Sequence, residues 1–362
     1  MIPVTQPFLP PIDEYQTLIS KIWEGKWLTN HGPFVQQLEQ KLQDYLHVPS
    51  LSFVSNGTVA LQLAIKSLHI RKQIITTPFS FIATLTSILW ENCEPVFVDI
   101  NPNTLCIDSQ KIEEAISEDT EAILATHVYG IPCDVEIIEA IAKKYNLKVI
   151  YDGAHAFGVR YKGNSILNYG DISTLSLHAT KLFHTVEGGG VINNSGEKLT
   201  QIIKRLRNFG FEGDHYDFAG INAKNSEFHA AMGLCNLKYV DEIIQKRKIL
   251  SGMYDILLED RFGRPYIASE VTYNYCYYPI IFESEEELLN VKDVLEKHQI
   301  LTRRYFTPSL NQLPYLKGEF SCPVSEDISK RVLCLPLYSD LKSSDAEKIV
   351  ALVMKKSIKS YL

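Results

Sequence analysis

The chain has 362 residues, of which 45% are hydrophobic and 22% are charged, and its formal net charge at pH 7 is −7. This composition excludes a disordered tail protein and a small disulfide-stapled protein, and the acidic balance provides no basic field for nucleic acid or anionic lipid. Because no apolar run approaches about 18 residues, the sequence predicts no membrane span. A chain of this length is expected to form one large domain and a smaller one.

The N-terminal sequence MIPVTQPFLPPIDEY carries prolines and acidic residues where a secretory signal has a basic start and an apolar stretch, which predicts a cytoplasmic protein. Two helices are expected next, over residues 13–23 and 34–46, with the turn-rich segment GKWLTNHGP between them. The seven cysteines are scattered and never spaced as Cys-x-x-Cys. That pattern favours buried thiols over a disulfide framework or a zinc site, and no other metal-binding motif occurs.

From about residue 50 to 195, short β-rich runs alternate with segments of helical period. The runs cover residues 51–55, 73–77, 95–99, 122–128, 148–152, 172–176 and 191–193, and the helical segments cover 59–68, 82–91, 109–116 and 134–145. Alternation of apolar strands with helices predicts an α/β fold whose mainly parallel sheet is covered on both faces. Ligands of such sheets bind beyond the carboxyl ends of the strands, so polar residues directly after a strand are the first candidates for a site.

The rest of the chain predicts a second, smaller unit. Residues 226–254 carry apolar residues at helical spacing and are expected to lead into it. A strand-like run over 273–282, a helix near 285–298 and a last helix near 345–355 indicate a small α+β domain. The predicted domains are therefore residues 1–245 and 246–362.

The first candidate site is the run Ser55, Asn56, Gly57 and Thr58, which closes a predicted strand and opens the helix VALQLAIKSL. A small, glycine-containing turn at a helix N-terminus exposes backbone N–H groups and the positive end of the helix dipole, which suits a phosphate. An ordinary helix cap, with Ser55 or Thr58 accepting from the first turn, explains the same residues. Neither a P-loop nor a G-x-G-x-x-G sequence is present, so the common nucleotide signatures are missing.

The second and third candidates each follow a predicted strand. Asp152 ends the strand KVIYD, and small residues and His155 come next; the carboxylate could hold a protonated ring nitrogen or a metal, or simply cap the loop. Lys181 ends the run SLHATK, and a lysine buried in such a loop becomes a nucleophile able to form a Schiff base, although most lysines are surface charges. A phosphate cup, a strand-end acid and a strand-end lysine together are what pyridoxal phosphate requires.

Ordered motifs along the chain resemble those of the DegT/StrS family of pyridoxal-phosphate sugar aminotransferases. They are WLTNHGPF, SNGTVAL, TPFSFIAT, PVFVDI, THVYGIPCD, VIYDGAHAFG, SLHATK, EGGG and GINAKNSEFHAAMG, with ILTRRYFTPSL and LCLPLY in the region of the family's small domain. The resemblance covers nearly the whole chain. It implies a fold-type I aminotransferase, with a mostly parallel, mixed seven-stranded sheet in the large domain and a small α+β C-terminal domain.

The resemblance also implies the catalytic groups. Lys181 matches the Schiff-base lysine, Asp152 the partner of the pyridinium nitrogen and His155 the contact to the ring oxygen of pyridoxal 5'-phosphate. Some relatives carry histidine in place of this lysine and dehydrate the sugar, so Lys181 implies transamination. His178 and His184, close to that lysine, are expected to be structural.

Further positions match contacts to the cofactor. Gly57, Thr58 and Ser176 match phosphate contacts, and Phe81 matches the aromatic ring that stacks on the cofactor. Asn222 matches an asparagine that reaches the phosphate in the neighbouring subunit, which implies a homodimer with shared active sites. The family's usual Arg-Met pair after this asparagine is Lys224-Asn225 here, so the remaining contacts between subunits are left open.

The implied reaction is the transamination of a nucleotide-linked 4-keto-6-deoxy sugar, with dTDP-4-keto-6-deoxy-D-glucose as the expected substrate and L-glutamate as the amino donor. The amino sugar would serve bacterial surface polysaccharide. A 3-aminotransferase of the same family and a same-fold enzyme acting on a small amino acid are the alternatives. Because both substrates are anionic and the chain is acidic, local cations are required, and the candidates are Arg207, Lys224, Arg303 and Arg304.

Overall fold

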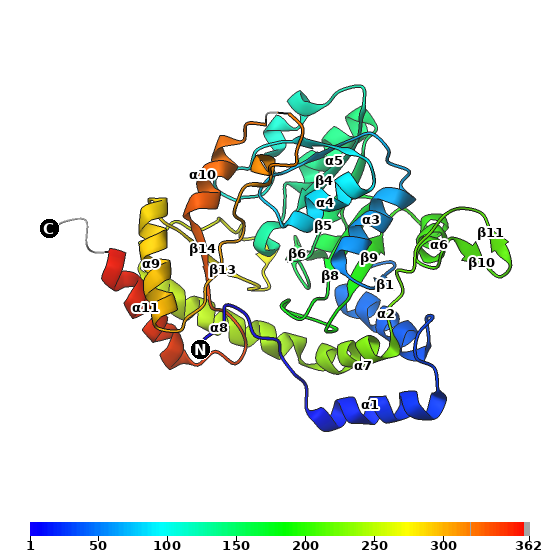
Figure 1. Cartoon of the computed structure of the whole chain (residues 1–362), viewed down its shortest axis with the longest axis horizontal. Helices are drawn as coiled ribbons and strands as arrows, with labels where there is room; N and C mark the ends of the chain where they lie inside the picture. Colours follow the sequence, from blue (N-terminus) through cyan, green and yellow to red (C-terminus); the bar gives the residue numbers. More distant parts are fainter. Residues whose placement is uncertain (319, 358–362) are drawn as a thin grey trace.

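The computed structural model describes residues 1–318 and 320–357 and is built around a mixed β-sheet (Figure 1). Within the described residues, seven strands form this sheet, in the spatial order β1 (Ser52–Val54), β9 (Gly189–Asn193), β8 (Ile172–Ser176), β5 (Lys148–Asp152), β4 (Thr120–Thr126), β2 (Gln73–Thr76) and β3 (Glu94–Phe97). Neighbours from β8 to β3 are parallel, whereas β9 runs antiparallel to both β8 and β1. The predicted α/β fold is confirmed, and each of the seven strands predicted between residues 50 and 195 lies in this sheet.

Helices pack on both faces of the sheet. On one face they are α2 (Pro33–Leu46), α5 (Val135–Tyr145) and α7 (Glu227–Asn236), and on the other α3 (Gly57–Ser67), α4 (Ile82–Trp90) and α6 (Glu197–Leu206). The central strand β4 shows why: Ile123 and Ala125 belong to the first core, whereas Ala122 and Leu124 belong to the second. Because side chains alternate along a strand, the apolar run from Ala122 to Ala125 requires cover on both sides of the sheet.

A further apolar core forms in the C-terminal part of the chain. It surrounds the antiparallel pair β13 (Tyr278–Ile281) and β14 (Val332–Leu335) and is flanked by α8 (Val240–Leu258), α9 (Glu285–Lys297) and α11 (Ser343–Ser357). The N-terminus joins this unit, since Ile2 N–H donates to the carbonyl of Gln299 and Leu301 N–H donates to that of Ile2, each at 2.8 Å. The predicted boundary after residue 245 falls inside α8, and the division into two domains stays a prediction.

Two predicted elements differ in the structure. The expected helix over 109–116 consists of two short 3₁₀ turns, Ser109–Lys111 and Glu113–Ala115. Within the expected strand over 273–282, only the β13 residues pair as a strand. Asn274 explains the second difference, because its amide donates to the carbonyls of His155 and Phe157 at 2.8 and 3.0 Å and its Oδ1 accepts from Cys276 N–H at 3.2 Å. Such side-chain bonds compete with strand pairing.

The remaining elements lie outside the main layers. They are α1 (Ile12–Gly25), β6 (Arg160–Tyr161), β7 (Asn164–Ser165), β10 (Phe211–Glu212), β11 (His215–Tyr216), β12 (Val271–Thr272) and α10 (Pro323–Arg331). Figure 1 shows α1 along one side of the molecule, below α7, and the β10–β11 hairpin projecting from the body. All seven cysteines are buried and free, as their spacing predicts. In the described part of the chain, no helix has the length and apolar character needed to cross a membrane.

A buried ion pair between Glu39 and Arg207 connects α2 with the segment that follows α6. The carboxylate of Glu39 accepts from the guanidinium of Arg207 and from the N–H of Phe53 at 2.7 Å, and it lies 2.8 Å from His31 Nε2. Burial by itself raises the pKa of Glu39, but the charge of Arg207 and the bond from His31 outweigh it, so the pKa lies below its ordinary value. Arg207 therefore already has a carboxylate partner, contrary to its expected role as a free cation for substrate.

We expect Arg207→Ala to lower the free energy of unfolding by about 3 to 5 kcal/mol at pH 7, because it leaves a carboxylate buried without its partner. Since the folded pKa of Glu39 is depressed below the reference value of 4.5, the pair stabilises the fold above that pH and loses its contribution as pH falls through the folded pKa. Urea unfolding at decreasing pH will measure both effects. Lys72→Ala, which breaks an exposed pair with Asp119, is the control and should leave the midpoint nearly unchanged.

Candidate functional site

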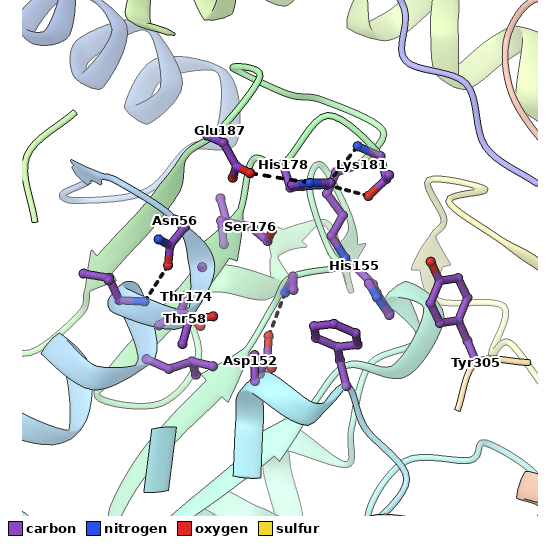
Figure 2. Close-up of a pocket in the computed structure, with 18 of the residues that line it drawn as sticks. Asn56, Thr58, Asp152, His155, Thr174, Ser176, His178, Lys181, Glu187 and Tyr305 are labelled. Atoms are coloured by element: carbon purple, nitrogen blue, oxygen red, sulfur yellow. Dashed lines mark hydrogen bonds and ion pairs between the residues drawn. The ribbon is translucent and has the colours of Figure 1, made fainter. Parts of the chain in front are cut away.

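The main cavity lies at the carboxyl ends of the parallel strands and has a volume of about 590 Å³. Seven of the site residues that the sequence predicts line it: Gly57, Thr58, Phe81, Asp152, His155, Ser176 and Lys181. Figure 2 shows the side chains of Asp152, His155 and Lys181 around the same space. Asn222 is exposed and lies outside the residues that line this cavity. The structure thus brings together every predicted site residue except the one expected to act in the neighbouring subunit.

The N-terminus of α3 forms one wall of the cavity. Asn56 is extended, at φ −167°, and its Oδ1 accepts from Val59 N–H at 2.9 Å. The helix cap is therefore Asn56, and the alternative that assigned the cap to Ser55 or Thr58 is wrong. The first N–H groups of a helix have no partner within the helix, so Gly57 and Thr58 are placed to bind an anion in the cavity.

This wall requires glycine because two backbones approach closely. A Cβ atom on Gly57 would lie 2.9 Å from the Cβ of Ser176 and 3.2 Å from its Cα, at the end of β8. A Cβ on Gly189, in the neighbouring strand β9, would lie 2.3 Å from the carbonyl oxygen of Asn56. The start of α3, the end of β8 and the start of β9 therefore form one compact cradle of backbone and hydroxyl groups.

Asp152 sits at the end of β5 and is 4% exposed. Its Oδ2 accepts from the hydroxyl of Thr84 at 2.7 Å, and its Oδ1 accepts from Ala154 N–H at 3.0 Å. The Thr84 hydroxyl in turn lies 2.7 Å from that of Ser80, which is 3.0 Å from the hydroxyl of Thr126. A carboxylate has roughly four acceptor positions, so this network orients Asp152 and leaves it able to accept from a ligand. Sequence reasoning missed Thr84, although it stands in the quoted motif TPFSFIAT.

His155 is also buried, and its Nδ1 accepts from the backbone N–H of Tyr129 at 3.1 Å. Burial, with a smaller effect from the charge of Lys181, holds the pKa of His155 well below its usual value. The imidazole is therefore neutral at physiological pH. Tyr129 is a second residue that sequence reasoning did not single out.

Lys181 lies in the loop between β8 and β9, and its backbone N–H donates to the carbonyl of His178 at 2.9 Å. Burial lowers the pKa of Lys181 below its ordinary value, and the negative charge of Asp152 partly opposes that effect. A lowered pKa increases the neutral fraction of the amine, which is the form that attacks a carbonyl carbon. The structure thus supplies the condition that the sequence could only suggest.

The two histidines near Lys181 have different surroundings. His184 is buried, with Nε2 at 2.7 Å from the carbonyl oxygen of Phe8 and Nδ1 accepting from Val186 N–H at 3.2 Å, which fits the structural role expected of it. His178 lines the cavity, and its Nε2 lies 3.6 Å from the carboxylate of Glu187 (Figure 2). The expectation that His178 is purely structural did not anticipate this position.

The candidate cations separate into distinct sites. Arg303 lines the main cavity, with its guanidinium 5.1 Å from the ring centroid of Tyr305. Arg304 is engaged elsewhere, donating to Glu285 at 2.7 Å and to the carbonyl of Lys330 at 3.0 Å. Of the proposed cations, Arg303 is thus the one placed at the cavity.

Lys224 and Arg207 lie at a second cavity of about 590 Å³. It is lined by Asn30, His31, Lys204, Arg207, Asn208, Phe209, Phe211 and Lys224. Lys224 donates to Asn208 Oδ1 at 2.8 Å and lies over the ring of Phe209, and the backbone of Asn222 pairs with that of Asn208. Asn225, the other residue that departs from the family pattern, donates to the carbonyl of Glu187 at 2.9 Å and so links this segment to the EGGG loop.

Comparisons with known proteins agree with this geometry. A model of the DegT/DnrJ/EryC1/StrS aminotransferase family matches residues 12–354. A dTDP-4-amino-4,6-dideoxy-D-glucose transaminase from Escherichia coli is 41% identical with 98% of each chain covered, and one from Shigella dysenteriae is 43% identical with 97% of each covered. The crystal structure of DesI in the presence of its TDP-sugar product superposes with a TM-score of 0.93 at 28% identity, covering 99% of this chain and 93% of that one.

We expect Gly57→Ala to lower the free energy of unfolding by about 1 to 3 kcal/mol, because its Cβ meets the backbone end of β8 rather than a movable side-chain tip. Gly252→Ala, in the middle of α8, is the matched control: a Cβ there has nothing within 4 Å, so the change should stabilise by about 0.5 to 1 kcal/mol. Urea unfolding of both variants measures the contrast. Equal effects of the two changes would contradict the close approach.

Proposed function

The chain belongs to the DegT/DnrJ/EryC1/StrS aminotransferase family, and from this membership we propose that it transfers the amino group of L-glutamate to dTDP-4-keto-6-deoxy-D-glucose, using pyridoxal 5'-phosphate. The product is dTDP-4-amino-4,6-dideoxy-D-glucose, the amino sugar in the names of the two relatives. The observation that carries the proposal is the arrangement of Lys181, Asp152 and the N-terminus of α3 around one cavity. We place the reaction in the cytoplasm and its product in the synthesis of surface polysaccharide.

The residues present fit the cofactor. The cradle that a Cβ on Gly57 would fill, with the helix N-terminus and the Ser176 hydroxyl, suits its phosphate. The carboxylate of Asp152 has acceptor capacity left for a protonated ring nitrogen, and the exposed ring of Phe81 lies in the cavity wall. When bound, pyridoxal phosphate supplies an aldehyde that links to amines and a ring that withdraws electrons from the adjoining carbon.

Lys181 performs the proton transfers. Its amine would hold the aldehyde of the cofactor at rest and would act as a base once the donor amine has replaced it. With the cofactor held there, Lys181 would take the proton from the α-carbon of glutamate; overall the amino group would pass to the cofactor, and water would supply the keto oxygen of 2-oxoglutarate. In the second half-reaction the keto sugar enters, and Lys181 delivers a proton to the sugar carbon that receives the amine. The lowered pKa of Lys181 favours the neutral amine, which is the form that can accept a proton.

Asp152 and His155 act on the environment of the reacting carbon. Asp152, oriented by Thr84 and Ala154, would keep the ring nitrogen of the cofactor protonated. His155, whose lowered pKa keeps the imidazole neutral, would contact the ring oxygen. Arg303 provides a positive charge at the cavity for an anionic substrate.

We propose a homodimer in which Asn222 completes the site of the neighbouring subunit. Large apolar side chains are exposed around α1 and the second cavity, among them Trp23, Trp27, Leu28, Phe209 and Ile221. An exposed apolar surface of this kind is typical of an interface between copies. The basic side chains of the second cavity, Lys204 and Lys224, would then lie near the anionic ligands of the partner.

We expect the wild-type enzyme, given dTDP-4-keto-6-deoxy-D-glucose and L-glutamate, to yield the 4-amino sugar by NMR. Lys181→Ala should lower turnover by more than about 1,000-fold, because tether, base and acid are lost together. The same variant should lack the visible absorbance of the covalently held cofactor. Lys144→Ala, an exposed lysine paired with Glu113, is the control and should retain both activity and colour.

The other outcomes separate the alternatives. A 3-amino product would overturn the assignment of the sugar position and leave transamination standing. Turnover of a small amino acid, with none of the keto sugar, would favour the same-fold enzyme. A Lys181→Ala variant with wild-type activity would end the assignment of the lysine.

Subunit complementation tests the shared site. Asn222→Ala should lower activity about tenfold or more, because it removes a hydrogen bond to a phosphate. After Asn222→Ala and Lys181→Ala are mixed, dissociated and reassociated, activity should rise above that of either variant, since each mixed dimer contains one intact site. The measured quantity is the steady-state rate of the mixture. Activity that never exceeds the average of the separate variants would contradict a site built from two subunits.

A further inference from the structure

Tyr129 lies in the turn after β4 and is fully buried, with a left-handed backbone conformation at φ +54°. Residues other than glycine rarely adopt this conformation unless their surroundings hold them in it. Two groups hold its carbonyl: the hydroxyl of Tyr273 and the thiol of Cys276 each donate to it at 2.7 Å. The hydroxyl of Tyr129 donates to the carbonyl of Tyr305. The turn is therefore anchored by groups distant from it in sequence.

The N–H of this turn determines where the hydrogen of His155 resides. A backbone N–H can only donate, so the Nδ1 atom that it contacts at 3.1 Å must accept. A neutral imidazole carries a single N–H, which must then be on Nε2. Because the ring lines the cavity, His155 is a hydrogen-bond donor toward a ligand there. The opposite tautomer would present a lone pair and repel a negatively charged oxygen.

We propose that Tyr129 is a positioning residue whose backbone amide fixes His155 in the Nε2–H tautomer, and that Tyr273 and Cys276 hold that amide in place. The inference rests on the proposed function for the meaning of the tautomer, since the ring oxygen of the cofactor is the acceptor that His155 would serve. Residues 273–276, which precede β13 and lie outside the seven-stranded sheet, would thus help to orient a side chain of the active site.

Further hydrogen bonds hold residues 274–276 in place. The amide of Asn274 donates to the carbonyls of His155 and Phe157, at 2.8 and 3.0 Å. From α8, the buried guanidinium of Arg247 donates to the carbonyl of Cys276 at 3.0 Å. Bonds on both sides thus hold the segment between α8 and the loop of His155. A displacement of the segment would reach the Tyr129 carbonyl directly.

In the same turn, Gly130 packs closely against the loop of His155 and against Asn274. A Cβ on Gly130 would lie 2.7 Å from the carbonyl oxygen of His155 and 2.9 Å from Oδ1 of Asn274. The rings of Tyr129 and His155 are parallel within 3°, with centroids 6.4 Å apart. Rotation of the imidazole to exchange its nitrogens would take Nδ1 away from the Tyr129 N–H and leave that buried donor without this acceptor.

The test uses the cofactor-loaded enzyme labelled with ¹⁵N-histidine. Long-range ¹H–¹⁵N correlation spectra, with His155→Asn to assign the signal, should show the hydrogen of wild-type His155 on Nε2. Tyr273→Phe removes one bond to the Tyr129 carbonyl and should shift the tautomer ratio about fivefold toward Nδ1–H. Tyr275→Phe, which removes a hydroxyl from the same segment without changing a bond to that carbonyl, is the matched control and should resemble wild type. A wild-type ring protonated on Nδ1 would overturn the proposal.

A second pair of variants covers the case in which Tyr273→Phe does not fold. Cys276→Ala removes the other donor, whereas Cys276→Ser retains one at the same position. Weaker donation from His155 would leave more negative charge on the ring oxygen of the cofactor, and that charge favours the protonated form of the nearby Lys181 nitrogen. Cys276→Ala should therefore raise the pH at which the visible absorbance titrates by about half a unit. Cys276→Ser should restore the wild-type value. Identical titrations for all three proteins would overturn the proposed effect of Cys276 on His155. This outcome is distinct from failure of the proposed function, because transamination by the wild-type enzyme is measured separately.

Discussion

A lysine amine buried beside a carboxylate is the physical arrangement on which this molecule's chemistry depends. Burial disfavours the charged form of Lys181, and the nearby charge of Asp152 limits that effect, so the pKa of the amine lies below its ordinary value. Both groups stand at the carboxyl ends of neighbouring parallel strands, β5 and β8. The parallel sheet is what makes such an arrangement possible, because it aligns the loops after successive strands on one edge.

The same edge brings a helix N-terminus against the strand ends. Gly57 and Gly189 permit backbone contacts that a Cβ would prevent, and the resulting cradle presents amides and hydroxyls in place of charged side chains. An acidic protein can therefore offer a local site for a phosphate without a cluster of cations. Arg303 adds positive charge from the C-terminal part of the chain, which joins this region to the site.

The C-terminal part does more than cover the cavity. Its segment before β13 contacts the turn of Tyr129 through Tyr273 and Cys276, and that turn contacts His155. Because the Tyr129 amide can only donate, it determines which nitrogen of His155 accepts. The C-terminal part of the chain thereby influences the orientation of His155. Asn225, which departs from the family pattern, also contacts the surroundings of the cavity, because its amide donates to the backbone carbonyl of Glu187.

Local sequence was enough to predict the seven strands of the main sheet, the α/β fold and the candidates Asp152 and Lys181, because apolar periodicity and strand-end polar residues are local properties. The other predicted site residues, such as Phe81, were implied by the family resemblance. The sequence also indicated the family through Asp152, His155 and Lys181 in their motifs. It did not predict that Arg207 would be paired with Glu39, that residues 273–276 would leave the strand, or that Thr84 and Tyr129 would orient the catalytic groups. Those features depend on hydrogen bonds between residues far apart in the chain. Periodicity carries no information about such partners, and only the packed fold brings them within bonding distance.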